Sequence, residues 1–384
     1  MNQWYCSICH ADLHQETRPE TCDSCGADSR VILSSQEEIP ESVEQVRDNA
    51  RKKLKKICAA YPFCDGNYDK VCQREAYGGP IGFGGAGAGL SFHENVAALS
   101  KIKLKTSVVG DHFEPETGTD FLGLALDFPI LSSSSAGVER YNGCMDETDF
   151  CRAVVAGSKE AGTIALRGDT ASYTLDAHSS LAAIAESGGW GIPIFKPREQ
   201  SVLKKLLDMA EENGARAVGV DLDGCGSTIM ARMGQPVFKK SIREIRELVE
   251  HTALPFIAKG IMTPEDAEMC AEAGVSVVGV SNHGGRVLDS TPGTADVLPA
   301  IKERLKDRVT ITADGGVRTG YDVFKMIALG ADAVLLGRDI IRAAVGGGTL
   351  GVKLHLEHVG GVLKKAMFMT GTRTLEGAKH KIIL

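Results

Sequence analysis

The chain has 384 residues, of which 43% are hydrophobic and 24% charged, so it can build a folded core and is not a disordered protein. Its formal net charge of −7 argues against nucleic acid or an anionic membrane as its main partner. The sequence shows no apolar run of membrane-spanning length and no N-terminal signal segment, and we therefore expect a cytoplasmic protein.

Two C-x2-C pairs stand close to the N-terminus: Cys6 with Cys9, and Cys22 with Cys25. Two such turns that face each other make a tetrahedral site of four thiolates for zinc or iron. Crowded cysteines in a reducing compartment favour metal binding over disulfides. A segment this short has little apolar core, so the metal would supply much of its folding free energy. We predict a small metal-binding domain over residues 1–34.

The ends of this segment carry a recognisable pattern. Trp4-Tyr5-Cys6 at its start and Cys22-Asp23-Ser24-Cys25-Gly26-Ala27 at its end resemble the rubredoxin-like module of rubrerythrins. The resemblance implies one iron ion held by four thiolates, with zinc as the alternative metal. The chain departs from that family at His10, where the family has glycine, and at Asp23, where it has proline.

Residues 35–90 are predicted to be a helical connector followed by a cysteine-rich and glycine-rich segment. Its cysteines, Cys58, Cys64 and Cys72, follow a C-x5-C-x7-C pattern. Two interpretations of this pattern stand side by side. The three thiols hold an iron–sulfur cluster with a fourth ligand from elsewhere, or they are reduced cysteines that pack as small hydrophobic residues.

From Asp127 onward, short β-rich apolar runs alternate with amphipathic helical stretches. The runs begin at Phe128, Gly162, Gly191, Ala217, Leu254, Val275, Val309 and Ala333. Helices are predicted over 147–160, 200–213, 242–251, 264–273 and 320–329. This alternation indicates parallel βαβ units, and eight units are the number found in a (β/α)8 TIM barrel. We predict an α/β protein with such a barrel over residues 91–384, and a doubly wound sheet is the alternative.

Polar residues cluster directly after the apolar runs. Asp221 ends the fourth run, Lys259 the fifth and Asn282-His283 the sixth. In a barrel these ends converge on one face, which is the face that carries active sites. Glycine and arginine follow the last two runs, at 314–318 and 337–338, where barrels commonly bind phosphate. The sequence therefore predicts a phosphate-bearing ligand at this face.

The same segments resemble a known family. Lys259-Gly260, the run SNHGGR at 281–286, ADGGVR at 313–318 and Gly337-Arg338 are similar to FMN-dependent 2-hydroxy acid dehydrogenases and oxidases, such as glycolate oxidase and lactate oxidase. The resemblance implies an enzyme with FMN as its cofactor. A single phosphate site without a G-x-G-x-x-G fingerprint also favours FMN over FAD.

Matched residue by residue, the resemblance implies a role for each position. His283 would be the base that takes a proton from the substrate, and Asp221 would orient and charge that histidine. Lys259 would stabilise the reduced flavin, and Arg286 would clamp a substrate carboxylate. The flavin-binding residues would be Ser133, Lys259, Ser281, Asp314, Gly315, Gly316, Arg318, Gly337 and Arg338.

The predicted function is oxidation of a small, lactate-like 2-hydroxy acid by proton abstraction and hydride transfer to FMN, with electrons relayed through iron centres. A one-electron acceptor or donor protein and a homo-oligomeric assembly are expected with it. Two alternatives remain: a non-redox FMN isomerase resembling type 2 isopentenyl diphosphate isomerase, and a metal-ribbon electron carrier whose barrel is idle.

The substrate stays open because the chain departs from the family at substrate-binding positions. The family's second substrate arginine has no counterpart in residues 224–228. Its strand-three glutamine and tyrosine appear here as Pro193 and Phe195.

Overall fold

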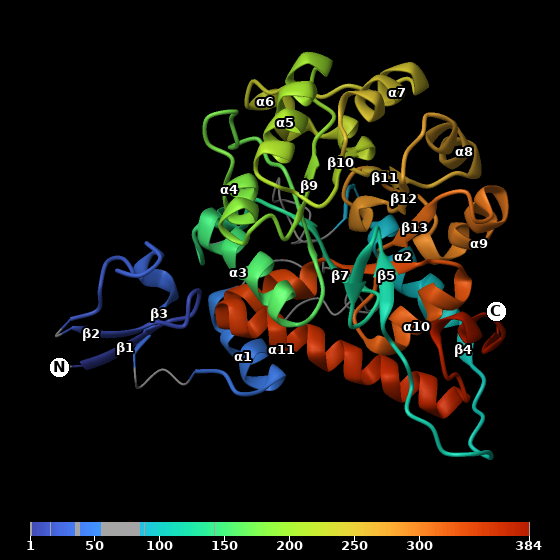
Figure 1. The fold of residues 1–384 in the computed structure, drawn as a ribbon, viewed down its shortest axis with the longest axis horizontal. Coiled ribbons are helices and arrows are strands. Elements are labelled where there is room, and N and C mark those ends of the chain that lie inside the picture. The colour runs from blue at the N-terminus through green and yellow to red at the C-terminus, as the bar shows by residue number, and fades with distance from the viewer. Residues whose placement is uncertain are drawn as a thin grey trace.

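The computed structural model describes residues 2–15, 17–34, 39–54, 85–87, 89–141 and 143–383. Eight parallel strands form a closed barrel in chain order, with the last strand pairing with the first (Figure 1). The barrel strands are β7 (Ile130–Ser135), β8 (Ala165–Arg167), β9 (Ile192–Phe195), β10 (Val218–Asp221), β11 (Phe256–Ile261), β12 (Val277–Val280), β13 (Thr310–Ala313) and β14 (Ala333–Leu336). The predicted TIM barrel is confirmed, and the doubly wound sheet is excluded.

Helices connect the strands and pack around the barrel. They are α3 (Glu147–Glu160), α4 (Ser179–Glu186), α5 (Gln200–Glu212), α6 (Thr228–Arg232), α7 (Ile242–His251), α8 (Pro264–Glu272), α9 (Thr294–Leu305), α10 (Gly320–Leu329) and α11 (Arg338–Thr370). Several begin at a side chain that accepts a backbone N–H, as Asp146, Thr263 and Thr319 do. The five helices predicted from the sequence are present, with ends that differ by one residue at most.

The inside of the barrel is filled by side chains. Leu131, Leu166, Ile194 and similar residues of the strands form one apolar cluster. Phe121 of the hairpin β5 (Thr119–Phe121) and β6 (Leu124–Leu126) packs into the same cluster. A short sheet of β4 (Lys103–Leu104) and β15 (Ile382–Ile383) joins the two ends of the barrel segment. With the interior filled, the cavity is formed by the carboxyl ends of the strands and the loops that follow them.

Helix α2 (Leu90–Lys101) packs closely against the loops that follow β12 and β13. A Cβ atom on Gly285 would lie 2.3 Å from the backbone nitrogen of Phe92, and one on Gly316 would lie 2.8 Å from the carbonyl oxygen of Asn95. Both glycines also have positive φ, +77° and +78°. Glycine is required at both positions because the backbone conformation and the close approach exclude a side chain.

Helix α11 packs against α1 (Val43–Lys53), which lies within the predicted connector. A Cβ on Gly346 would lie 2.0 Å from the carbonyl oxygen of Val46, so the glycine lets the helices touch. The helix is interrupted at Gly348, where φ is 58° and ψ is −141°. None of the helices in the described ranges has the length and apolarity needed to cross a membrane.

A three-stranded antiparallel sheet precedes α1, in the order β2 (Asp12–Gln15), β1 (Asn2–Cys6), β3 (Ile32–Ser34). It lies at one side of the barrel, near α3 and α11 (Figure 1). Thr349 donates its backbone N–H to Ser7 O and its hydroxyl to Ile8 O, at 2.9 and 2.7 Å. Asp28 donates its N–H to the Asp149 carboxylate at 2.8 Å. These bonds dock the sheet on the barrel.

Two sequence predictions have no test in this fold. Cys58, Cys64 and Cys72 lie outside the described residues, so a second metal centre stays a prediction. The division into domains at 1–34, 35–90 and 91–384 also stays a prediction.

Candidate functional site

A cavity of about 510 Å³ opens at the carboxyl ends of the barrel strands. Its size is that of a site for a cofactor or small molecule. The predicted site residues that line it are Ser133, Lys259, His283, Arg286, Asp314, Gly315, Gly316, Arg318, Gly337 and Arg338. Asp221 and Ser281 are buried directly behind this lining, in contact with Lys259. The structure therefore brings the predicted residues of the barrel to one place.

The loop that carries His283 is held in an unusual conformation. His283 has a φ of +57°, in the left-handed region that residues other than glycine seldom adopt. The preceding Asn282 exchanges two amide hydrogen bonds with Asn95 of α2, at 2.8 and 3.0 Å. Asn282 also accepts the N–H of Gly285 at 3.0 Å. Because these bonds fix both ends of the turn, α2 determines where the imidazole points.

Two carboxylates hold the imidazole of His283. Its Nδ1 lies 3.0 Å from Asp223 Oδ1 and 3.2 Å from Asp221 Oδ2. Because carboxylates accept hydrogen bonds, Nδ1 carries a proton and Nε2 of the neutral ring is left as an acceptor. The sequence predicted Asp221 in this position but not Asp223, which stands two positions further along the chain. The histidine therefore has a second carboxylate partner that the resemblance did not imply.

The two carboxyl groups respond to burial in opposite ways. Burial raises the pKa of Asp221, but the hydrogen bond from His283 and the positive charges of Lys196 and Lys259 outweigh burial and hold that pKa well below the ordinary value. Burial and the negative charge of Asp221 raise the pKa of Asp223. Asp221 is therefore the charged partner of the histidine, and Asp223 is the carboxyl group that takes up a proton more readily.

Lys259 lies at the centre of the barrel mouth and is buried. Its ammonium donates to Ser281 Oγ at 2.9 Å and lies 3.3 Å from both Asp221 Oδ1 and Asp314 Oδ2. Burial lowers the pKa of Lys259, but these two carboxylates outweigh burial and raise it. The lysine therefore keeps its positive charge.

The cluster of Asp221, Asp223 and His283 has the spacing of a metal site, since one ligand atom from each lies within 4.8 Å of the others. Two ammonium groups already lie against Asp221, those of Lys196 at 2.6 Å and Lys259 at 3.3 Å. Positive charge is thus supplied by the chain itself. We assign this cluster to proton chemistry rather than to a metal ion.

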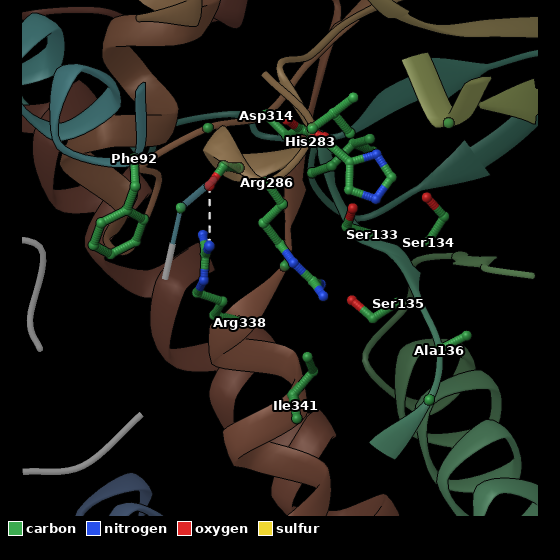
Figure 2. Close-up of a pocket in the computed structure, with 18 of the residues that line it drawn as sticks. Phe92, Ser133, Ser134, Ser135, Ala136, His283, Arg286, Asp314, Arg338 and Ile341 are labelled. Carbon is green, nitrogen blue, oxygen red and sulfur yellow. Dashed lines mark hydrogen bonds between the residues drawn. The ribbon is translucent and has the colours of Figure 1, made fainter. Parts of the chain in front are cut away.

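The opposite part of the cavity is rich in arginine. Arg338 donates to the carbonyl oxygen of Gly284 at 3.0 Å, and its guanidinium lies 4.6 Å from the centre of the Phe92 ring. Figure 2 shows the side chains of Arg338 and Arg286 projecting into the same space. Arg318 lines the cavity as well. Guanidinium groups bind phosphate and carboxylate with paired hydrogen bonds, so this part suits anionic groups.

Two local features fit the flavin cofactor that the sequence predicted. Asp314 Oδ1 is buried without a hydrogen-bond partner among the described residues, so it can accept a hydrogen bond from a ribityl hydroxyl. A Cβ atom added to Gly337 would meet nothing within 4 Å, so the backbone here faces open space beside Arg338. Gly315 and Gly316 have a further reason to be glycine, since they pack against Asn95 of α2.

A second candidate site lies in the N-terminal sheet, where the four predicted cysteines come together. Cys6 Sγ lies 3.7 Å from Cys25 Sγ, and Cys9 Sγ lies 3.6 Å from Cys22 Sγ. A tetrahedral centre with metal–sulfur bonds of about 2.3 Å has sulfur–sulfur edges of about 3.8 Å. The four thiols therefore have the spacing that a bound zinc or iron ion requires.

The two cysteine turns have matching backbone geometry. His10 donates its N–H to Cys6 O, as Gly26 does to Cys22 O, at 3.0 and 2.7 Å. The φ angles of His10 and Gly26 are 63° and 72°, so His10 occupies a position that favours glycine. Burial raises the pKa of Cys6 to about 12, and metal binding therefore has to displace a proton from this thiol.

The comparison with protein families decides the identity of the barrel. A family of FMN-dependent dehydrogenases matches residues 82–232 and 226–384. The chain belongs to this family. The prediction of an FMN-dependent oxidoreductase is therefore confirmed, while the resemblance of residues 1–34 to rubredoxin-like modules stays a prediction.

Several similar proteins are named as oxidases of hydroxy acids. The chain is 29% identical to an L-lactate oxidase of Lacticaseibacillus rhamnosus (strain LMS2-1), over 77% of this chain and 86% of the relative. It is 30% identical to 2-hydroxyacid oxidase 1 of Homo sapiens, over 74% and 85%. A crystal structure of mandelate oxidase with (S)-2-phenylpropionate superposes with a TM-score of 0.70 at 25% identity and covers 89% of this chain and 98% of its own.

Proposed function

We propose that this enzyme oxidises a 2-hydroxy acid to the 2-oxo acid with FMN as its cofactor. The observation that carries the proposal is the arrangement of His283, whose Nδ1 is held by carboxylates while the ring lines the cavity with Nε2 as its acceptor. Arg286, three positions along the chain, lines the same cavity. The names of the lactate and 2-hydroxyacid oxidases among its relatives support the same substrate class.

Several residues would hold the cofactor. Arg318 and Arg338 would bind its phosphate, Asp314 its ribityl hydroxyls, and Lys259 the electron-rich edge of its ring. FMN, when bound, supplies the acceptor for the two electrons that leave the substrate as a hydride. Flavin released from the purified protein by heat is expected to be FMN, and release of FAD would contradict this assignment.

The residues of the chain manage the substrate's charge and its proton. Arg286 binds the carboxylate with two parallel hydrogen bonds, which also orient the neighbouring carbon atom. His283 Nε2 accepts the proton of the hydroxyl group, and the imidazole becomes positively charged. The negative charge of Asp221, 3.2 Å from Nδ1, stabilises that imidazolium. Proton removal and hydride departure together turn the C–OH group into C=O.

The four-cysteine site adds a second proposal, that residues 1–34 bind iron. An iron ion there would supply a one-electron redox group beside the flavin barrel, whereas zinc would supply only structural stability. The segment Arg338–Thr370 contacts both sites: Thr349 donates its N–H to Ser7 O in the turn between Cys6 and Cys9, and Arg342 lines the cavity. Metal analysis and a visible spectrum of the purified protein test this; zinc in the site would refute the iron assignment.

The test of the main proposal is anaerobic addition of 2-hydroxy acids to the FMN-loaded protein. Lactate, glycolate and mandelate are compared with propionate, acetate and phenylacetate, which lack the hydroxyl group. We expect at least one hydroxy acid to bleach the flavin absorbance and none of the matched acids to do so. If no hydroxy acid bleaches the flavin, the proposal is wrong, and a non-redox FMN isomerase becomes the favoured function.

A further inference from the structure

Lys196 is a cation of the cavity that the sequence analysis did not single out. It follows β9 directly and lines the cavity. Its ammonium lies 2.6 Å from Asp221 Oδ2 and 3.3 Å from His283 Nε2. The second distance matters most, because Nε2 is the atom that takes the substrate's proton in the proposed reaction.

The position of Lys196 is fixed by its neighbours. Its backbone N–H donates to Asp169 Oδ2 at 3.0 Å, and Asp169 is in turn held by two hydrogen bonds from Arg198, at 2.9 and 2.6 Å. Gly224 makes room for the side chain, since a Cβ there would lie 2.8 Å from Cδ of Lys196. The chain therefore anchors this lysine at both its backbone and its stem.

Lys196 differs from Lys259 in what surrounds its charge. Lys259 is enclosed by Ser281, Asp221 and Asp314. The side chain of Lys196 is 14% exposed, and its ammonium has three N–H groups, with Asp221 and His283 as hydrogen-bonding neighbours. Both ammonium groups line the cavity, and that of Lys196 is the more exposed of the two.

We propose that Lys196 donates a hydrogen bond to the substrate's α-oxygen, the hydroxyl oxygen whose proton His283 removes. This inference rests on the proposed function. Because Nζ and Nε2 are only 3.3 Å apart, an oxygen at about 2.8 Å from Nε2 can also lie within hydrogen-bonding distance of Nζ. The substrate oxygen then takes the place that Nε2 holds as the acceptor of Lys196.

The lysine contributes charge and gives up no proton of its own. As the O–H bond breaks and the N–H bond forms at His283 Nε2, negative charge grows on the α-oxygen, and the ammonium of Lys196 stabilises it. The carbon atom loses a hydride, which bound FMN would accept, and the oxygen becomes the carbonyl of the 2-oxo acid. The same hydrogen bond then holds the product, so a 2-oxo acid is a direct probe of the contact.

The experiment compares two ligands that differ at the α-oxygen alone. Pyruvate carries a 2-oxo group, and propionate has the same carboxylate and chain length without it. Their dissociation constants are measured from perturbation of the flavin spectrum in the oxidised FMN-loaded wild type, in Lys196→Met and in Lys196→Arg. Lys205→Met, at an exposed lysine on α5, is the control.

We expect Lys196→Met to bind pyruvate about 10- to 100-fold more weakly, the range for one hydrogen bond to a charged group. Its affinity for propionate should stay within about twofold of wild type, and Lys196→Arg should recover part of the pyruvate affinity. A parallel loss for both ligands would overturn the proposal, because it would indicate binding of the carboxylate or collapse of the pocket. Unchanged pyruvate affinity in Lys196→Met would overturn it as well.

The failures of the two proposals can be told apart. If no 2-hydroxy acid bleaches the wild-type flavin, the proposed function fails. If bleaching occurs but the pyruvate and propionate affinities respond equally to Lys196→Met, only the role of Lys196 fails. Phenylglyoxylate and phenylacetate form a second matched pair for a larger pocket, and a wild type that prefers neither 2-oxo acid over its partner contradicts the inference.

Discussion

The two carboxylates beside His283 give a sharp prediction, because the same chemical change at positions two apart should have opposite consequences. Asp221→Asn removes the carboxylate that lies 2.6 Å from Lys196, 3.3 Å from Lys259 and 3.2 Å from His283. Asp223→Asn removes a carboxylate whose Oδ2 is buried without a hydrogen-bond partner among the described residues. We expect the first variant to lose stability and the second to lose none.

The magnitude for Asp221→Asn follows from the charges left behind. Lys259 keeps Asp314 at 3.3 Å, but Lys196 loses the carboxylate that forms its ion pair. Breaking a buried ion pair costs about 3–5 kcal/mol. Because the Lys196 side chain is 14% exposed, water recovers part of this cost, and we expect a loss near the lower end, about 3 kcal/mol.

Asp223→Asn should not lose stability, and its stability relative to wild type should depend on pH. Burial and the charge of Asp221 raise the folded-state pKa of Asp223 above 3.8, so folding disfavours its ionised form. Wild-type stability is therefore reduced at pH values above the unfolded pKa, and the Asn variant avoids that reduction. Any advantage of the variant at pH 7 should vanish as the pH falls below about 4, where the wild-type carboxyl is protonated in both states.

The assay is urea unfolding at pH 7 with excess FMN, followed by far-ultraviolet circular dichroism. Asp221→Asn should unfold at a clearly lower urea concentration than wild type, and Asp223→Asn at an equal or higher one. Equal losses in the two variants would refute the assignment of Asp221 as the charged partner. A loss under about 1 kcal/mol for Asp221→Asn would refute the magnitude.

Three further predictions concern other parts of the molecule. Arg286→Lys should weaken binding of propionate more than about 10-fold, because an ammonium cannot form the paired hydrogen bonds of a guanidinium. An unchanged dissociation constant for propionate would show that Arg286 does not bind the carboxylate. Cys9→Ser should lower bound metal by one equivalent per chain in elemental analysis, while Cys144→Ser, outside the cluster, should not. Asn95→Leu removes both amide bonds to Asn282 and should slow flavin reduction by lactate at normal flavin content, whereas an unchanged rate would show that α2 does not position the His283 loop.

The barrel was predictable because its signals are local in the sequence. Each strand is a short apolar run, each helix has its own periodicity, and most polar site residues directly follow a run. His283, Lys259 and Asp314 could therefore be assigned to one face from chain order alone. Chain order also places Lys196 at the end of its run, but a lysine at a strand end is common. Its contact with Nε2 depends on the segments after β9 and β12 converging at the mouth of the barrel.

Long-range packing was beyond the sequence. Asn95 and Asn282 are far apart in the chain, and neither residue type identifies the other as its partner. The sequence gives no reason for the glycines at 346–348. The structure shows that they allow close contact of α11 with α1 and with the N-terminal sheet. The sequence assigned Asp221 alone to His283, and only the fold shows that Asp223 also reaches the imidazole.

The central claim is that His283 Nε2 takes the proton of a 2-hydroxy acid, and single-turnover reduction of the flavin tests it most directly. Wild type and His283→Ala, loaded equally with FMN, are mixed anaerobically with the hydroxy acid that reduces the wild type fastest, and the loss of flavin absorbance is followed in time. We predict that the variant is bleached at least about 100-fold more slowly, the scale of a lost general base. Bleaching of His283→Ala at the wild-type rate would contradict the account.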